Sequence, residues 1–317
     1  MTMNIGADID KNLGVAELAE LFGGSPDEVS RWCAPFLDAF DFRYTELAGA
    51  ERDAMLLEAV KRLEPNAVSV AGQGRKPDWE AGWSENLTEF LAGGHQLDAL
   101  VPKYIRPNEV VRLFGQYARP RAPHFIRNYT KTYRAWLAQR FFADAAAIYE
   151  FGCGPGSHVA YFAETFPEKP VVGLDWAAAS VNIMEAIAGH YGWKVSGHRF
   201  DFFAPDHGIR LPEGTAVLTF GALEQVGTNH GPFLDYLLAN KPLRCVHVEG
   251  INELYDEENL LDRLALRYHQ QRNYLSNLLT RLQELEKAGR VVIESVHRQR
   301  FGTRFNDTFS HVVWRPA

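Results

Sequence analysis

Five short apolar runs of strand length in the second half of the sequence constrain the fold most. They cover residues 146–152, 170–176, 195–203, 215–221 and 243–250. Helical stretches, among them 157–166 and 177–191, separate these runs. Strands that alternate with helices are typical of a parallel sheet with crossover helices. Two further strand-like runs within residues 290–316, joined by a short turn, predict an antiparallel hairpin at the end of an α/β domain.

The first 140 residues show helical periodicity and almost no strand signal. Ser25-Pro26-Asp27-Glu28 has the form of a helix start with proline in the first turn. The pattern predicts helices over 15–22, 27–40, 46–63, 79–91, 107–116 and 124–142, and a linker at 118–123. We therefore predict an all-helical N-terminal region, residues 1–140, that forms a lid, an acceptor wall or a dimer contact. The α/β domain then covers 141–317, with one long helix over 257–288.

The composition favours a soluble protein without bulk affinity for nucleic acid or membranes. The chain has 317 residues, 46% of them hydrophobic, and a formal net charge of −7. No apolar run approaches the ~18 residues that span a bilayer, and the N-terminus shows no secretory pattern, so we expect a cytoplasmic protein. Three cysteines, far apart in the sequence, fit reduced thiols and predict neither disulfides nor a clustered metal site.

The most informative motif is a glycine-rich turn, Gly152-Cys153-Gly154-Pro155-Gly156, which leaves a predicted strand and opens a predicted helix at Ser157-His158. Glycine permits positive φ and lets a ligand lie against bare backbone, although a glycine triplet alone can mark only a tight turn. Asp175 closes the next strand, where a carboxylate can accept from ribose hydroxyls. Asp201 closes the third strand, where a carboxylate can accept from an adenine amino group. Either aspartate alone also suits a helix N-cap, but the three features in order indicate a nucleoside site.

These residues resemble the motifs of the class I S-adenosylmethionine-dependent methyltransferases. The first motif of that family, an acidic residue before GxGxG, corresponds to Glu150 and the turn 152–156. The second corresponds to Val172-Gly173-Leu174-Asp175 and the third to Arg199-Phe200-Asp201-Phe202. The terminal hairpin also matches, so the resemblance covers about residues 140–317. It implies a Rossmann-like, seven-stranded methyltransferase sheet that binds S-adenosyl-L-methionine.

The resemblance also implies roles for the motif residues. The three glycines line the methionine portion of the cofactor, Asp175 binds the ribose and Asp201 the adenine. Trp176 packs either on the adenine face or only against the protein. The predicted cofactor-binding residues are Glu150, Gly152, Gly154, Gly156, Asp175, Trp176, Asp201 and Phe202.

A dinucleotide oxidoreductase is the rival on the same fold. Its fingerprint is GxGxxG, whereas this turn is one residue shorter between the second and third glycines. The difference matters because a pyrophosphate needs backbone donors at the start of the helix. Glu150 and Asp201 also favour the methyltransferase, which leaves the oxidoreductase as a minor alternative.

The acceptor is predicted to bind over the ends of the fourth and fifth strands. Glu224 and Glu249 lie there and suit a cationic or polyhydroxylated acceptor, although Glu224 also fits a helix N-terminal carboxylate. His230, in the loop 227–231, is the preferred imidazole base. The predicted catalytic residues are Glu224, His230 and Glu249. No spacing of histidines and carboxylates predicts a metal site.

We therefore predict methyl transfer to an oxygen or nitrogen atom of a small polar metabolite, sugar-like or amine-bearing, with a homodimer as a possible assembly. A non-catalytic S-adenosylmethionine-binding protein on the same fold stays open as an alternative. An RNA methyltransferase is the third hypothesis, based on arginines and aromatic residues between 119 and 136. An aromatic helix that packs on the catalytic domain explains that segment better, because the chain as a whole is not basic.

Overall fold

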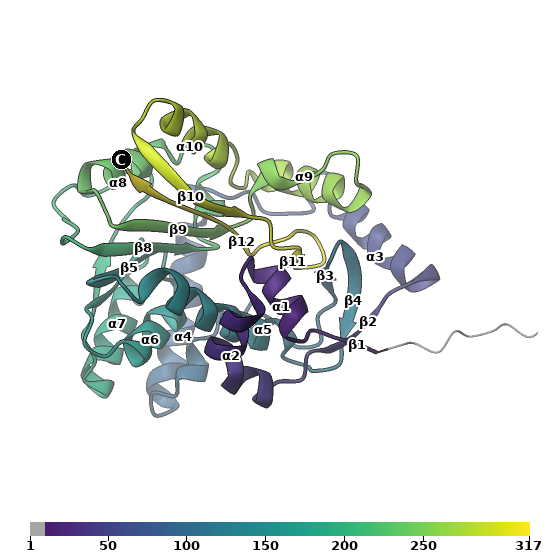
Figure 1. Cartoon of the computed structure of the whole chain (residues 1–317), viewed down its shortest axis with the longest axis horizontal. Coiled ribbons are helices and arrows are strands. Elements are labelled where there is room, and N and C mark those ends of the chain that lie inside the picture. Colours follow the sequence, from purple (N-terminus) through teal and green to yellow (C-terminus); the bar gives the residue numbers. More distant parts are fainter. Residues whose placement is uncertain (1–9) are drawn as a thin grey trace, which may run out of the picture.

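The computed structural model describes residues 10–317, and its centre is a seven-stranded mixed sheet (Figure 1). The strand order is β10-β12-β9-β8-β5-β6-β7. Neighbours among β5 to β9 run parallel, whereas β12 is antiparallel to both β9 and β10. The strands are β5 (Ala147–Phe151), β6 (Val171–Asp175), β7 (Val195–Arg199), β8 (Thr215–Phe220), β9 (Arg244–Glu249), β10 (Val291–His297) and β12 (Ser310–Pro316). The predicted sheet with its terminal antiparallel hairpin is confirmed.

Helices cover both faces of this sheet, which explains the nearly unbroken apolar runs in its strands. All five positions of β6 are buried, as expected for a strand between two helical layers. Figure 1 shows α6 (Ser157–Thr165) and α7 (Ala178–Tyr191) on one face, and α8 (Gly231–Asn240) and α10 (Leu278–Lys287) on the other. The strand order reverses beside β5, whose neighbours are β6 and β8. In open α/β sheets, ligands bind at the carboxyl ends of the strands at such a reversal.

A second sheet corrects the prediction of an all-helical N-terminal region. This antiparallel sheet has the order β1-β2-β4-β3-β11. Its strands are β1 (Lys11–Asn12), β2 (Arg43–Glu46), β3 (Val111–Leu113), β4 (Gln116–Pro120) and β11 (Phe301–Gly302). Because β11 comes from the connection between β10 and β12, that connection is longer than the short turn predicted from the sequence.

Two of these strands replace a predicted helix and a predicted linker. Residues 107–116 and 118–123 contain the β3–β4 hairpin instead. Phe114 and Gly115 join the two strands with φ values of +51° and +75°, as a tight hairpin turn requires. The apolar spacing around β3 suits a helix face as well as a short buried strand, so local periodicity does not distinguish the two. The pairing of β3 with β11 makes this segment a strand.

Helices are still the main secondary structure of residues 10–140. They are α1 (Val15–Phe22), α2 (Pro26–Ala39), α3 (Gly49–Lys61), α4 (Lys76–Ala92) and α5 (Phe125–Leu137), with a π-helical turn at Ala138–Phe142. Ser25 caps α2 as predicted: its Oγ accepts from the Glu28 amide at 3.2 Å, and its own amide donates to the Glu28 carboxylate at 3.2 Å.

The prediction of one long helix over 257–288 is wrong, because this segment contains two helices. α9 covers Leu260–Arg272, and α10 begins after a break. Asn273 and Asn277 hold the break in the left-handed region, with φ values of +51° and +64°. Asparagine tolerates this conformation better than most residues, and it ends the first helix at Asn273.

The N-terminal region and the parallel sheet share buried contacts. The Arg112 side chain of β3, 1% exposed, pairs with Asp262 of α9 at 2.8 Å and with Asp307 at 3.3 Å. The Tyr129 ring of α5 stacks on Phe301 of β11 with centroids 3.7 Å apart. The boundary near residue 140 stays a prediction, and the chain on its two sides packs together.

Candidate functional site

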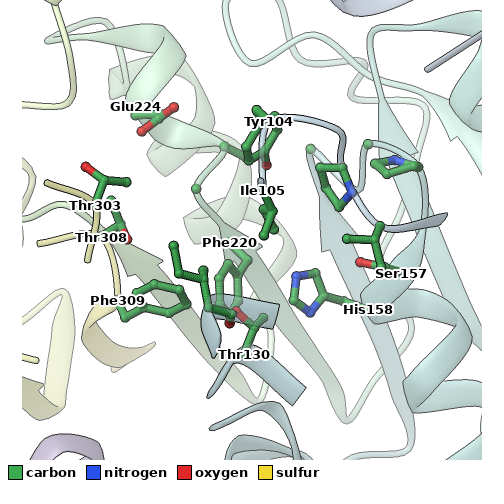
Figure 2. Close-up of a pocket in the computed structure, with 18 of the residues that line it drawn as sticks. Tyr104, Ile105, Thr130, Ser157, His158, Phe220, Glu224, Thr303, Thr308 and Phe309 are labelled. Atoms are coloured by element: carbon green, nitrogen blue, oxygen red, sulfur yellow. The ribbon is translucent and has the colours of Figure 1, made fainter. Parts of the chain in front are cut away.

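A cavity of about 1070 Å³ lies at the carboxyl ends of β5, β6 and β8, where the strand order reverses. Residues from the glycine-rich turn and the strand ends form its base, and the N-terminal region and the connection 302–309 supply other walls. In the view of Figure 2, Ser157 and His158 lie opposite Glu224 and Thr303, and Phe220 lies between them.

The glycine-rich turn needs glycine for steric reasons. Gly152, Gly154 and Gly156 have φ values of +73°, +53° and +77°, a region that other residues rarely adopt. A Cβ on Gly152 would lie 2.3 Å from the Ala222 Cβ, and one on Gly156 would lie 2.1 Å from Met184. Gly152 and Gly154 line the cavity, whereas Gly156 packs against α7. The predicted backbone cradle therefore has two lining glycines and one that shapes the turn.

Asp175 ties the glycine-rich turn to the end of β6. Its Oδ2 accepts from the Gly154 amide at 2.9 Å and its Oδ1 from the Ala177 amide at 2.8 Å. Burial raises the pKa of this carboxyl to about 6, against the opposing effect of the two amide bonds. Each oxygen keeps a further lone pair for a ligand hydroxyl, because a carboxylate has about four acceptor sites.

Glu150 is a buried carboxyl group beneath the same turn. It is 1% exposed and lines the cavity, and its Oε2 has no hydrogen-bond partner among residues 10–317. Burial raises the pKa of Glu150 well above its usual range, and the nearby Arg134 charge opposes that rise. A buried acceptor without a partner is costly, so it points to a ligand or water in this part of the cavity.

Of the residues predicted on the adenine side, two line the cavity and one does not. Trp176 and Phe202 line the cavity. Asp201 does not line it: the Asp201 Oδ1 accepts from the Phe203 amide at 3.0 Å, and its Oδ2 accepts from Lys76 of α4. Sequence reasoning did not foresee a lysine from the N-terminal region on this carboxylate.

Glu224 is the predicted catalytic residue that the structure places in the cavity wall (Figure 2). It lies in a 3₁₀ turn, Leu223–Val226, directly after β8. Burial raises the pKa of Glu224 to about 7, and the Arg272 charge and hydrogen bonds from Gln225 and Tyr274 oppose this rise. A carboxyl group that titrates near neutral pH is suited to general base catalysis.

Glu249 and His230 lie outside the cavity, which corrects their placement at the acceptor. Glu249 is fully buried, and its Oε1 accepts from the Ala222 and Leu223 amides at 3.1 Å each. It thus holds the turn that presents Glu224. The His230 ring contacts the Ser276 carbonyl oxygen at 3.0 Å through Nε2, at the start of α8. Its loop contacts the α9–α10 break, where the Ser276 amide donates to the Gly227 carbonyl oxygen at 3.3 Å.

The structure adds two cavity residues to which the sequence analysis assigned no role. His158 stacks on Phe220 with centroids 4.3 Å apart, and burial lowers its pKa well below the usual range, so the ring is neutral. Its place directly after the glycine-rich turn was an available signal. Tyr104, 63% exposed, reaches into the cavity from the segment between α4 and β3, and no sequence motif marks it.

The basic and aromatic segment between residues 119 and 136 packs its aromatic side chains into the protein and contributes Arg127, Lys131 and Arg134 to the cavity wall. Its aromatic side chains Tyr129, Tyr133 and Trp136 are buried, so they offer no stacking surface. Four of its cations lie beside carboxylates, in the pairs Arg119–Glu51, Arg121–Asp10, Arg127–Asp98 and Lys131–Asp98, and Arg134 donates to the Ser157 carbonyl oxygen at 2.7 Å. This arrangement fits the packing interpretation given above.

Within residues 10–317, no group of three or more histidine, cysteine, aspartate or glutamate side chains is arranged to hold a metal ion. In the same part of the chain, no helix is long and apolar enough to cross a bilayer.

Comparison with known proteins gives likenesses of fold. No family model and no curated protein matches the chain. One similar solved structure is the 16S rRNA methyltransferase RmtF, with 13% identity, a TM-score of 0.44, and coverage of 95% of this chain and 97% of that one. Another is RosA, an N,N-8-amino-8-demethyl-D-riboflavin dimethyltransferase from Streptomyces davawensis (18% identity, TM-score 0.40, coverage 98% and 90%). A third is the mitomycin 7-O-methyltransferase MmcR (15% identity, TM-score 0.41, coverage 98% and 89%).

Likenesses this distant carry no information about the substrate. The strand order identifies the fold more directly. The order of the parallel strands reverses beside β5, and the sheet ends in an antiparallel hairpin. With the glycine-rich turn after β5 and the aspartate that ends β6, this chain has the fold of the class I S-adenosylmethionine-dependent methyltransferases.

Proposed function

We propose that this protein is an S-adenosylmethionine-dependent methyltransferase that acts on an oxygen or nitrogen atom of a small polar acceptor. One observation carries the proposal: Asp175, the glycine-rich turn and Glu224 line a single cavity at the strand reversal. A nucleoside-binding carboxylate and a carboxyl group with a pKa near neutrality therefore share one space.

The residues present fit the cofactor. Asp175 offers free lone pairs for two ribose hydroxyls, and the bare backbone of Gly152 and Gly154 faces the cavity. The buried Oε2 of Glu150 and the buried Nε1 of Trp79 have no hydrogen-bond partner within residues 10–317. Both atoms can therefore form hydrogen bonds with a ligand. The cavity slightly exceeds the ~300–1,000 Å³ of typical ligand pockets, which leaves room for cofactor and acceptor together.

The cofactor, when bound, supplies a methyl group on a positively charged sulfur for in-line transfer. The chain has to hold the acceptor in line with that methyl group. It also has to take up the proton that the acceptor atom loses when it is methylated. We assign the proton to the Glu224 carboxylate, which is ionised above a pH of about 7 and stands in the cavity wall. The neutral ring of His158 lies across the cavity from it, on the side of the glycine-rich turn (Figure 2).

The acceptor half of the cavity combines apolar rings with hydroxyl groups. In Figure 2, Phe220 and Phe309 form an apolar floor, and Thr303 and Thr308 bring hydroxyls beside it. Such a wall suits a compact acceptor with several hydroxyl or amine groups. The N-terminal region contributes Tyr104, so we retain its proposed role as an acceptor wall.

The binding test uses isothermal titration calorimetry of the full chain with S-adenosylhomocysteine. We expect binding by the wild type, and a Kd about tenfold or more higher in Asp175→Asn, because the amide cannot accept at both oxygen positions. The exposed α8 residue Asp235 provides a matched control, Asp235→Asn, which should bind like the wild type. Binding of NAD without binding of S-adenosylhomocysteine would overturn the proposal.

The activity test uses labelled S-adenosylmethionine with a panel of hydroxylated and amine-bearing metabolites. Methylation of a panel member that depends on Glu224 supports the proposal. Tight binding of S-adenosylhomocysteine with no transfer to any panel member or to RNA would instead favour a non-catalytic binding protein.

A further inference from the structure

The helix α4 of the N-terminal region lies on the nucleoside side of the cavity, although the family resemblance begins only about residue 140. Three of its side chains, one turn apart along the helix, meet different parts of the parallel-sheet domain. Lys76 reaches Asp201, Glu80 reaches the start of α7, and Trp83 covers Gly154. Residues four apart share one face of a helix, so a single face of α4 makes all these contacts.

Glu80 anchors this face. Its Oε2 accepts from the Ala178 amide at 2.6 Å and its Oε1 from the Ala179 amide at 2.9 Å. The first amides of a helix have no partner within the helix, and the N-cap residue of α7 is Ala177, which has no capping side chain. A carboxylate from α4 therefore caps α7, with charge-assisted bonds that also match the helix dipole.

Trp83 and Trp79 turn the anchored helix into a wall of the cavity. Their rings stack with centroids 5.2 Å apart, and both residues line the cavity. A Cβ built on Gly154 would lie 3.0 Å from the Trp83 ring, so the indole lies directly over the glycine-rich turn. Trp83 packs with Ala177, Ala179 and the partly buried Trp176. The buried Nε1 of Trp79 has no acceptor within residues 10–317.

Lys76 completes the contact at the far edge. Its ammonium group pairs with Asp201 and lies 5.5 Å from the centroid of the Trp176 ring. Lys76 lies outside the part of the chain that resembles the family, yet it contacts both Asp201, which the resemblance assigns to the adenine, and the neighbouring Trp176.

We propose that α4 is a clamp for the nucleoside half of the cofactor, anchored by Glu80 and lined by Trp79 and Trp83. This inference rests on the proposed function, because it takes S-adenosylmethionine or S-adenosylhomocysteine as the ligand. The stacked indoles supply an aromatic surface for the adenosine, and the Trp79 indole N–H supplies a donor. Affinity for the cofactor then depends on how firmly Glu80 docks α4 on α7.

The test compares two substitutions on the same helix by titration calorimetry with S-adenosylhomocysteine. In Glu80→Gln the amide keeps the size of the side chain, but its NH₂ group opposes one of the two donors. We expect the Kd to rise about tenfold. Glu85→Gln is the control, because Glu85 is 63% exposed and does not line the cavity. It should change the Kd less than about twofold.

A second readout is independent of Glu80. Quenching of tryptophan fluorescence by S-adenosylhomocysteine should weaken in Trp83→Phe, in which Trp79 and Trp176 still line the cavity, and should keep its wild-type extent in Trp32→Phe, since Trp32 lies on α2 outside the cavity. Unchanged affinity in Glu80→Gln together with unchanged quenching in Trp83→Phe would refute the clamp. Tighter binding by Glu80→Gln would also refute it, because α4 would then obstruct the cofactor. If the wild type itself does not bind S-adenosylhomocysteine, the proposed function fails first.

Discussion

The substitution Glu249→Gln should stabilise the protein at neutral pH, although Glu249 is a buried carboxyl beside the candidate site. Its Oε1 accepts from two backbone amides, whereas its Oε2 has no partner among the residues described. A glutamine oxygen can keep both amide bonds, and its NH₂ group replaces the oxygen that makes none. The substitution therefore removes a buried ionisable group and retains the contacts that hold the turn after β8.

The size of the effect follows from the pKa of Glu249. Burial raises it from 4.5 to about 8, so the folded state binds the proton more tightly than the unfolded chain does. The stabilisation is fully present below pH 4.5 and is lost as the pH rises toward 8. Each pH unit in this window costs about 1.4 kcal/mol, so three units cost about 4 kcal/mol as an upper limit. Glu249→Gln escapes this loss.

Urea unfolding of both proteins at several pH values measures the difference directly. The gap in unfolding free energy should be near zero at pH 4.5 and should grow in favour of Glu249→Gln as the pH rises to 7.5. Comparison of the two proteins cancels the titration of groups that do not interact with Glu249; Glu224, whose charge raises the Glu249 pKa, is the exception. A gap that does not change with pH, or a Glu249→Gln protein that is less stable at pH 7.5, would refute the reasoning.

Three further predictions concern the site and its support. Glu224→Gln should lower kcat about 10²–10⁴-fold and leave the Kd of S-adenosylhomocysteine unchanged. The wild-type kcat should rise with pH around a midpoint near 7. A wild-type kcat that does not change from pH 5 to 9 would show that Glu224 is not the base. Gly156→Ala should destabilise the fold by more than about 1 kcal/mol, because positive φ and the contact with Met184 both oppose a Cβ; thermal unfolding of Gly189→Ala, on exposed α7 surface, is the control. Ser25→Ala should cost about 1 kcal/mol through loss of the α2 cap, and the loss should be absent in Ser25→Asp, which caps equally well.

The sequence by itself determined the parallel sheet and the core of the candidate site. The alternation of apolar runs with helices reports burial on both faces of each strand, and this pattern is local. The glycine-rich turn is local as well, because positive φ restricts the residue type whatever lies nearby. Asp175 follows from the same logic, since a residue that ends a strand next to this turn has to lie beside it.

Only the tertiary structure decided what surrounds that core. β3 becomes a strand because it pairs with β11, from near the other end of the chain, and no local pattern records that partner. The contacts of Glu80 with the start of α7 and of Lys76 with Asp201 also join distant segments, and no local pattern records them. Glu249 and Glu224 are both acidic residues at strand ends, yet one is turned into the protein and the other into the cavity. Their difference comes from side-chain direction and from contacts between distant segments, which sequence spacing does not encode.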